Sequence, residues 1–306
     1  GERHLDEEKS LHQDLYISPA LRFLGINSSK EEADYLLLGV PYDGTSTHRP
    51  GSRFAPNAIR EASKNLETVS LRSGVDLENV KIHDLGDLDV ASSLDETLRR
   101  LELVIKESRQ QGKFQVSLGG EHAITLGAVR AWGSEIGILD FDAHMDLRDE
   151  YQGARLSHAT FMRRIAEEIG AERIVQVGVR AACQEELRFA AEEKIRFFTS
   201  YDLSRSGVAS TAGRIRREIK DFEKIYLTVD ADVLDPSFAP AVGNPEPEGI
   251  STTQLIELLC GVLDHRIVAM DLVEVSPVYD SGATAAQVCK VLFEIICLME
   301  KMKRHR

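Results

Sequence analysis

Short apolar runs alternate with longer amphipathic segments along most of the chain. The short runs are rich in Val, Ile, Leu and Phe and have the length of strands. Apolar side chains at successive positions, without polar alternation, are typical of strands that are buried on both faces of a parallel sheet. Eight strands are therefore predicted, at residues 35–40, 80–85, 114–118, 136–142, 173–179, 195–200, 224–230 and 266–275.

The longer segments have the period of helices. Apolar residues recur every three or four positions in 95–112, 212–222 and 252–265, and charged residues occupy the other face. A further helix is predicted at 284–303, where it packs against the rest of the protein. Strands that alternate with helices predict an α/β fold with a largely parallel sheet covered on both faces. No linker or composition break is visible, so a single domain over residues 1–306 is the simplest expectation.

Acidic residues outnumber basic ones, 50 against 37, and the net charge is −13. This sign argues against nucleic acid as the main partner, because phosphates would be repelled. A small cationic ligand is compatible with it, although surface carboxylates also serve solubility alone.

No segment has the composition of an export signal or a membrane span. Residues 1–10 are charged and lack the apolar core of a signal peptide. The longest apolar run near the end, 291–300, contains Glu294 and is too short to cross a bilayer. We therefore expect a soluble, cytoplasmic protein without a membrane partner. The four cysteines form no CxxC pair and are interpreted as free thiols of a reducing compartment: Cys183, Cys260, Cys289 and Cys297.

Carboxylate and imidazole side chains recur at every second position where two of the predicted strands end. Asp142, His144 and Asp146 follow the fourth strand, and Asp230 and Asp232 follow the seventh. In an extended segment alternate side chains point the same way. Like charges at about 4 Å repel by several kcal/mol at an intermediate dielectric. Protonation, exposure to water or bound cations would each remove that cost.

The carboxyl ends of parallel strands meet at one edge of the sheet, where binding sites form. His122 lies at the same edge, after Gly119 and Gly120, whose lack of side chains lets the backbone approach the site closely. Two histidines and four aspartates without a thiolate suit manganese, and to a lesser degree iron, cobalt, nickel or zinc. Six ligands are too many for one open catalytic ion but suit two ions that share carboxylates.

The expected charge of this site favours a cationic substrate. Two divalent ions, four aspartates and a bridging hydroxide leave the site slightly negative, and Glu274 adds one more negative charge. Such a pocket attracts a guanidinium-like group and repels a phosphate ester.

Six motifs together resemble the ureohydrolase family, which contains arginases, agmatinases, guanidinobutyrases and formimidoylglutamases. They follow the family's order and spacing within residues 39–280. The DAHxD and DxDxxDP elements are highly specific in combination. The motifs are GGEH at 119–122, DAHMD at 142–146, SHATFMRR at 157–164, DADVLDP at 230–236, PEPEG at 245–249 and DLVEVSP at 271–277.

The resemblance implies a three-layer αβα fold of the arginase/deacetylase type, with an eight-stranded, mainly parallel sheet and two Mn²⁺ per subunit. It also implies a homo-oligomer, either a trimer or a hexamer. Asp142 and Asp230 would bridge the two ions. One ion would be held by His122, Asp142, Asp146 and Asp230, and the other by Asp142, His144, Asp230 and Asp232.

The same resemblance implies the chemistry. A metal-bridged hydroxide would attack the guanidino carbon of a small cationic substrate and release urea and an amine. Glu274 matches the family's guanidinium-binding glutamate, and His158 matches its proton-shuttling histidine. Asp146 is placed to carry a proton to the leaving amine.

Agmatine, which yields urea and putrescine for polyamine biosynthesis, is the leading substrate, because the PEPEG and SHATFMRR motifs look more like agmatinases than arginases. An arginase would also need an Asn and a Ser beside His158, and only Ser157 is present. Guanidinobutyrase, arginase and formimidoylglutamase remain alternatives, as does a non-catalytic metal-binding relative. The sequence departs from the agmatinase pattern at three positions: Asn244 where Thr is usual, Glu248 where Gly is usual, and Ala159 where Gly is usual.

Structural readings compete with several of these assignments. His158 can instead cap the following helix, and Glu274 can simply end a strand. The paired aspartates also resemble the DxD of glycosyltransferases or phosphatases, but neither alternative explains the histidines. Asp140 is assigned to a supporting position behind the ligands. Asp84 and Asp87 are expected to brace a turn, while Asp43 and His48 are open candidates for substrate contact.

Overall fold

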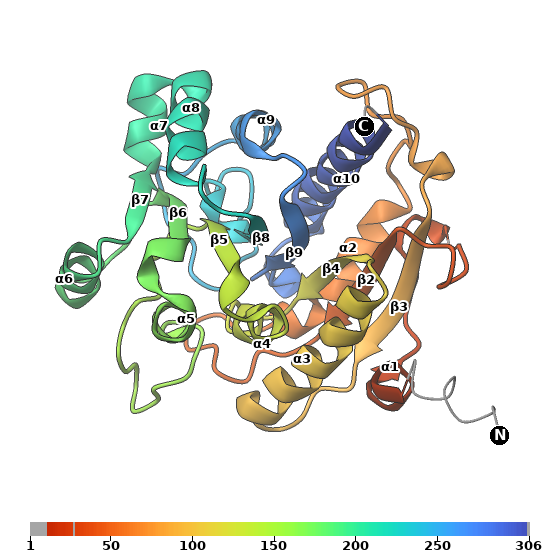
Figure 1. Ribbon diagram of the computed structural model, residues 1–306, viewed down its shortest axis with the longest axis horizontal. Coiled ribbons are helices and arrows are strands. Elements are labelled where there is room, and N and C mark those ends of the chain that lie inside the picture. The colour runs from red at the N-terminus through yellow and green to blue at the C-terminus, as the bar shows by residue number, and fades with distance from the viewer. Residues whose placement is uncertain (1–10, 27, 305–306) are drawn as a thin grey trace.

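The computed structural model describes residues 11–26 and 28–304, and a nine-stranded sheet runs through the middle of this part (Figure 1). The strands lie in the order β1-β3-β2-β4-β9-β8-β5-β6-β7. All neighbours are parallel except β1 and β3. The strands are β1 Ile17–Ser18, β2 Tyr35–Val40, β3 Ile82–Leu88, β4 Phe114–Gly119, β5 Ile136–Phe141, β6 Ile174–Val179, β7 Arg196–Thr199, β8 Lys224–Asp230 and β9 Ile267–Val273.

The eight predicted strands are all present, as β2 to β9, and the parallel arrangement is confirmed. The ninth strand, β1, has two residues and is too short to show a pattern in the sequence. The largest difference is at β3, which continues to Leu88. Asp84 and Asp87 were expected to brace a turn but lie within this strand, where the buried guanidinium of Arg60 neutralises both.

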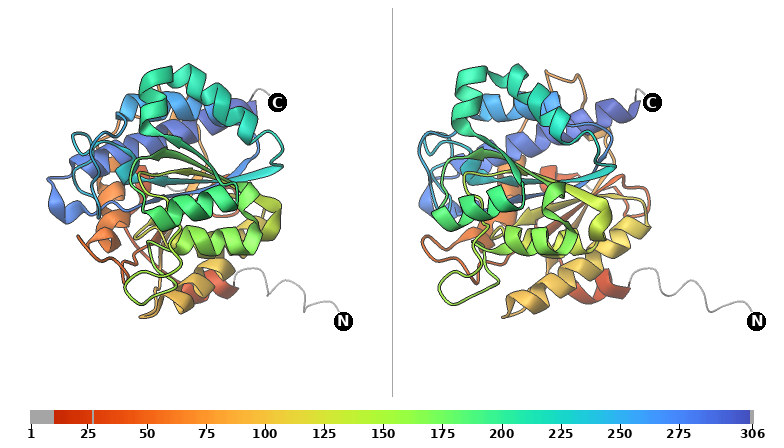
Figure 2. Two further views of the ribbon diagram at one scale, coloured as in Figure 1. Left: turned by 90° about the vertical axis from the view of Figure 1, so that its left-hand side faces the viewer. Right: turned by 60° about the vertical axis from the view of Figure 1, so that its left-hand side comes forward.

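Helices cover both faces of the sheet, which gives the three predicted layers (Figure 2). A connection between two parallel strands of one sheet is right-handed. The helix therefore lies on one face when the next strand is added on one side of the first strand, and on the opposite face when it is added on the other side. One layer contains α2 Ala55–Ser63, α7 Ser200–Ser206, α8 Val208–Glu218, α9 Thr252–Val262 and α10 Ala283–Arg304. The other contains α3 Leu94–Gln110, α4 Ile124–Arg130, α5 Phe161–Ile169 and α6 Gln184–Glu192, with α1 Leu11–Tyr16 against α3.

Each face of the sheet packs into its own hydrophobic core. Adjacent strand residues face opposite cores: Leu37 and Leu227 belong to one, whereas Leu38 and Tyr226 belong to the other. A strand with apolar residues at every position therefore fits only in the middle of such a sandwich. The apolar stripe predicted for α3 is buried, as Leu98, Leu101, Val104 and Ile105.

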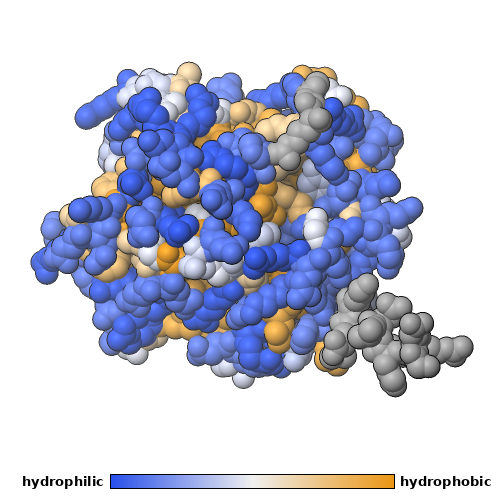
Figure 3. All heavy atoms as spheres, in the orientation of Figure 1, coloured by the Kyte–Doolittle hydropathy of each residue, from blue (hydrophilic) through white to orange (hydrophobic). Residues whose placement is uncertain are grey.

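The surface is mainly hydrophilic on the face shown in Figure 3. In the part of the chain that the structure describes, no helix is both long and apolar enough to span a bilayer. The N-terminal segment in which we expect no signal peptide, residues 1–10, lies outside the described residues.

Candidate metal centre

Four neighbouring strands, β4, β9, β8 and β5, end at the same edge of the sheet and bring distant residues together. His122 follows β4 by three residues, and Asp142 comes directly after β5. Asp230 is the last residue of β8, and Glu274 comes directly after β9. The predicted convergence at one sheet edge is therefore present in the fold.

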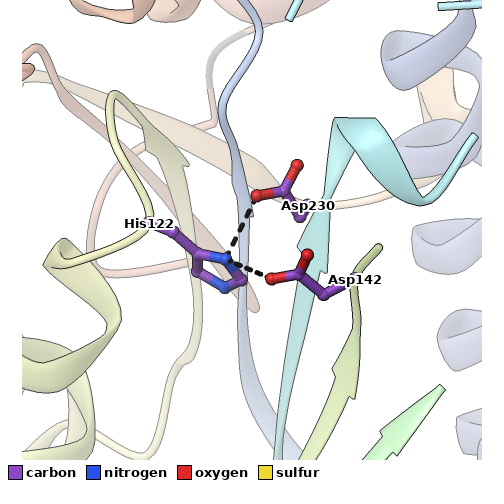
Figure 4. Close-up of side chains that lie close together, drawn as sticks. All are labelled: His122, Asp142 and Asp230. Carbon is purple, nitrogen blue, oxygen red and sulfur yellow. Dashed lines mark ion pairs between the residues drawn. The ribbon is translucent and has the colours of Figure 1, made fainter. Parts of the chain in front are cut away.

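A first group of possible ligands surrounds the imidazole of His122 (Figure 4). Its Nδ1 lies 2.9 Å from Oδ2 of Asp142 and 3.1 Å from Oδ2 of Asp230. All three residues are buried, yet Nδ1 of His122 and Oδ2 of Asp142 make no hydrogen bond within the described residues. Two facing acceptor atoms without donors are what a shared cation requires. Asp146 stands at the edge, with its Oδ2 3.9 Å from Nδ1 of His122.

A second group shares Asp142 with the first. Nδ1 of His144 lies 2.9 Å from Oδ2 of Asp232 and 3.6 Å from Oδ1 of Asp142. In each group the possible ligand atoms all lie within 4.8 Å of one another. The two groups are thus adjacent and linked by one carboxylate. Asp230, the second predicted bridge, belongs only to the first group.

The electrostatics of the cluster show that it needs compensating positive charge. Burial alone would lower the pKa of His122, but its contacts with Asp142 and Asp230 raise it well above the usual value. Burial raises the pKa of Asp230, and the nearby Asp232 and Asp142 raise it further. Protons therefore neutralise the cluster when no cation is bound, and a divalent cation would replace them. Imidazole and carboxylate donors without thiolates fit two hard or borderline ions such as Mn²⁺.

Buried hydroxyls orient His122 from behind. Its Nε2 lies 2.8 Å from Oγ1 of Thr228, which donates to Oδ1 of Asp271 at 2.5 Å. Thr125 and Tyr226 donate to the other oxygen of Asp271, each at 2.8 Å. Because the Thr228 proton goes to Asp271, the hydroxyl can only accept from His122. This fixes a ring proton on Nε2, so Nδ1, the atom that faces Asp142 and Asp230, offers its lone pair to a cation once the cation displaces the proton held there.

Asp140 lies behind the ligands and outside both groups. It is fully buried, its Oδ2 accepts a hydrogen bond from Gln176 at 2.9 Å, and its Oδ1 is 3.8 Å from Nε2 of His122. The supporting position expected for Asp140 agrees with this placement.

Two site residues have a strained backbone. Asp146 and Glu274 have φ values of 52° and 65°, in the left-handed region that residues other than glycine rarely adopt. At Glu274 this conformation lets the N–H donate to the carbonyl of Gly120 at 2.8 Å, while Oε1 accepts the N–H of His122 at 2.7 Å. Burial raises the pKa of Glu274 to about 8. The group is therefore largely protonated until a cation binds nearby, and within the described residues its Oε2 makes no hydrogen bond.

Above these residues lies a cavity of about 450 Å³. His122 and Asp142 do not line it, and both are buried. Six of the eight predicted site residues line it: His144, Asp146, His158, Asp230, Asp232 and Glu274.

Of the three departures from the agmatinase pattern, Asn244 and Ala159 line the cavity, and Glu248 lies outside it. Glu248 has a φ of 64°, which explains why glycine is usual there, and its carboxylate accepts the hydroxyl of Tyr201 at 3.1 Å. Asp43 and His48 do not line the cavity, and Asp43 instead accepts a hydrogen bond from Nε of Arg53 at 2.5 Å.

The cavity wall contains charged residues that the sequence pattern did not single out. Arg180 donates to backbone carbonyls, including those of Asp232 and Glu246, so it holds loops together. Arg148 stacks over the ring of Tyr151, 5.1 Å from its centre, and has no ion pair within the described residues. The carboxylate of Glu246 lies 3.8 Å from Nε2 of His144. Glu186 also lines the cavity, but its carboxylate accepts the backbone N–H groups of Leu147 and Cys183. Arg148 and Glu246 are the two charged wall residues, outside the predicted site, whose side chains are not committed to backbone groups in this way.

Comparisons with known proteins agree with this geometry. A family model described as the arginase family matches residues 33–298. An uncharacterized 32.2 kDa protein of Methanothermus fervidus is 40% identical over 263 residues, which cover 85% of this chain and 90% of that protein. The mitochondrial guanidino acid hydrolase of Homo sapiens is 33% identical over 289 residues, covering 91% and 82%. The crystal structure of agmatine ureohydrolase of Thermoplasma volcanium superposes with a TM-score of 0.88 at 35% identity, covering 95% of this chain and 98% of that one.

Proposed function

The chain belongs to the arginase family and acts as a hydrolase on carbon–nitrogen bonds of linear amidines, and we propose that its substrate is agmatine and its metal Mn²⁺. The observation that carries the proposal is the pair of ligand groups joined by Asp142 at the floor of a cavity whose wall includes Glu274. The similarity of this chain to the agmatine ureohydrolase of Thermoplasma volcanium supports the choice of agmatine as the substrate.

The groups around the cavity suit hydrolysis of a guanidinium. Two divalent ions held by the ligand groups would lower the pKa of a water molecule in the site and so supply a nucleophile at neutral pH. Glu274 would hold the guanidinium through Oε2, because Oε1 is occupied by the N–H of His122. The attacking water adds oxygen to the guanidino carbon, and the bond from that carbon to the substrate's chain nitrogen breaks. The products are urea and an amine.

The leaving amine must gain a proton, and two residues are placed to handle it. Asp146 lines the cavity beside the ligands and would carry the proton from the attacking water to the amine. Burial lowers the pKa of His158 to about 4, so its ring is neutral at pH 7 and can accept a proton. His158 would then exchange protons between the cavity and the solvent.

A urea-release assay tests the proposal. The protein loaded with Mn²⁺ should release urea from agmatine faster than from arginine or 4-guanidinobutyrate, and treatment with a chelator should abolish the release until Mn²⁺ is restored. No urea from agmatine at any Mn²⁺ concentration would refute agmatine as the substrate.

Arg148 favours a second candidate, a guanidino carboxylic acid. The guanidinium of Arg148 lines the cavity and makes no ion pair with residues 11–26 or 28–304, so it suits the carboxylate end of such a substrate. Glu246, in contrast, suits the ammonium end of agmatine. The two candidates therefore predict opposite roles for two wall residues.

Matched variants separate the candidates. If agmatine is the substrate, Glu246→Gln should raise its KM about tenfold or more, since a hydrogen bond to a charged group contributes about 1.5–3 kcal/mol, and Arg148→Met should leave that KM within a few-fold. If a guanidino acid is the substrate, Arg148→Met should raise the KM and Glu246→Gln should not. Steady-state urea release from both compounds measures this. Equal effects of the two variants on both compounds would contradict these roles.

We also propose that the protein assembles as a trimer or a hexamer, as the family resemblance implies. Light scattering of the purified protein measures its mass, and a monomer would contradict this proposal.

A further inference from the structure

A threonine hydroxyl from the loop after β2 lies between a buried carboxylate and His158. Oγ1 of Thr45 donates to Oε1 of Glu121 at 2.5 Å, and the N–H of Thr45 donates to Oε2 at 2.7 Å. The same hydroxyl accepts the backbone N–H of His158 at 2.9 Å. Glu121 is fully buried between Gly120 and His122. One carboxylate therefore holds the loop by two hydrogen bonds, and the loop holds His158.

The imidazole of His158 lies between two hydroxyls. Its Nδ1 is 3.4 Å from Oγ1 of Thr45, and its Nε2 is 3.4 Å from Oγ1 of Thr47. The edge of the Tyr151 ring meets the imidazole, with 5.8 Å between ring centres. Thr47, Tyr151 and His158 all line the cavity, whereas Thr45 does not. Nδ1 therefore faces the protein interior, and Nε2 lies at the cavity side.

A hydroxyl has one proton to donate, and in Thr45 that proton goes to the ionised carboxylate of Glu121. Because burial raises the pKa of Glu121 to about 7, this arrangement applies above neutral pH. Towards His158 the hydroxyl can then only accept, so the neutral imidazole must present a proton at Nδ1 rather than a lone pair. At 3.4 Å this contact is longer than an ordinary hydrogen bond, and its effect is to select an orientation and a tautomer rather than to bind strongly.

We propose that Thr45 is a positioning residue that, through Glu121, sets His158 in the Nδ1–H tautomer and leaves Nε2 as the nitrogen that exchanges protons with the cavity. The role of Nε2 in turnover rests on the proposed function, but the tautomer itself does not. A neutral histidine whose pyrrole-type proton faced the cavity would be unable to accept a proton there.

Nitrogen-15 NMR of histidine-labelled protein reads the tautomer directly, because the two ring nitrogens have different shifts with and without a proton. The His158 signals are assigned by their loss in His158→Asn. We expect the Nδ1–H tautomer in the wild type and in Thr45→Ser, which keeps the hydroxyl. Thr45→Val, which has nearly the same shape, should shift the population towards Nε2–H. Ser46→Ala, which removes a hydroxyl without a hydrogen bond within the described residues, is the matched control and should change nothing.

Kinetics give the second readout. Thr45→Val should lower kcat on whichever guanidine the protein hydrolyses by about tenfold or more, out of the roughly 10²–10⁴-fold that a positioned acid–base group contributes. KM should change little, and Thr45→Ser should restore most of the rate. An Nε2–H tautomer in the wild type, or an unchanged tautomer in Thr45→Val, would overturn the proposal. If Thr45→Val fails to fold, the wild-type and Thr45→Ser spectra still decide it. Inactivity towards agmatine would refute the substrate and leave the spectra unaffected.

Discussion

Replacing Asp232 with asparagine is expected to reduce the bound metal from two ions per chain to one and to lower kcat by about a thousandfold. Asp232 belongs only to the second ligand group, where its Oδ2 lies 2.9 Å from Nδ1 of His144. Asparagine keeps the shape of the side chain but loses the charge that holds a divalent cation. Loss of one of two ions removes several kcal/mol of charge stabilisation, and about 4 kcal/mol corresponds to a factor of roughly 10³ in rate.

Because Asp142 belongs to both ligand groups, the number of ions that is lost should depend on which ligand is replaced. His122→Asn should remove the ion of the first group only, whereas Asp142→Asn should remove both, because Asp142 belongs to the two groups. The proteins are dialysed against Mn²⁺ and then against metal-free buffer, and the metal content per chain is measured. We expect two ions in the wild type, one in Asp232→Asn, one in His122→Asn and none in Asp142→Asn. Urea release is measured on the same samples.

Asp235→Asn is the matched control for this series. Asp235 lies in the same DxDxxDP motif but outside the cavity, and its carboxylate accepts hydrogen bonds from Ser237 and from the N–H of Gly249. It should keep two ions and nearly full activity. Two ions in Asp232→Asn, or one ion in Asp142→Asn, would show that the ligand groups are wrongly assigned.

The strands, and the convergence of the carboxylate and imidazole side chains, could be predicted because both follow a repeating pattern. Apolar residues at successive positions identified β2 to β9, since only a sheet covered on both faces buries all of them. The alternation of Asp142, His144 and Asp146 predicted that these side chains converge, because side chains two residues apart in an extended segment point the same way. Asp142 and His144 do share one group of possible ligands, whereas Asp146 lies beside the groups with a left-handed backbone.

The residues that support the site were missed because each is a single polar residue far from its partner in sequence. Asp271 interrupts an apolar strand, and a carboxylate in the middle of such a run was the one available signal of a buried network. Thr45 and His158 are 113 residues apart, and no local pattern pairs them. These partners meet because they lie in loops that follow β2, β4 and β5, which all belong to the same parallel sheet.

The end of β3 was predicted wrongly for a related reason. Asp84, Gly86 and Asp87 are typical of a turn. The strand continues through them because Arg60, from helix α2 against one face of the sheet, supplies the positive charge that balances Asp84 and Asp87. Its guanidinium donates to both oxygens of Asp84 at 2.9 and 2.8 Å, to Oδ1 of Asp87 at 2.5 Å and to the carbonyl of Gly86 at 2.9 Å.

This arginine should be among the residues on which stability depends most. Arg60 is fully buried, so Arg60→Met would leave two carboxylates without their cation while keeping most of the side-chain volume. Removal of one partner from a buried ion pair costs about 3–5 kcal/mol, because the remaining charge cannot be solvated. We expect a loss of that size in the free energy of unfolding, measured by denaturant titration at one fixed protein concentration, since the stability of an oligomer depends on concentration.

Arg100→Met is the control for this prediction. Arg100 lies on α3 with 26% of its side chain exposed, and it pairs with Glu96 at 2.9 Å. Water can solvate Glu96 when Arg100 is removed, so the loss should stay below about 1 kcal/mol. Arg60→Lys should fall between the two, because an ammonium keeps the charge but cannot form the paired hydrogen bonds that the guanidinium makes with Asp84. If Arg60→Met costs no more than Arg100→Met, the ion pairs of Arg60 with Asp84 and Asp87 do not contribute the stability assigned to them.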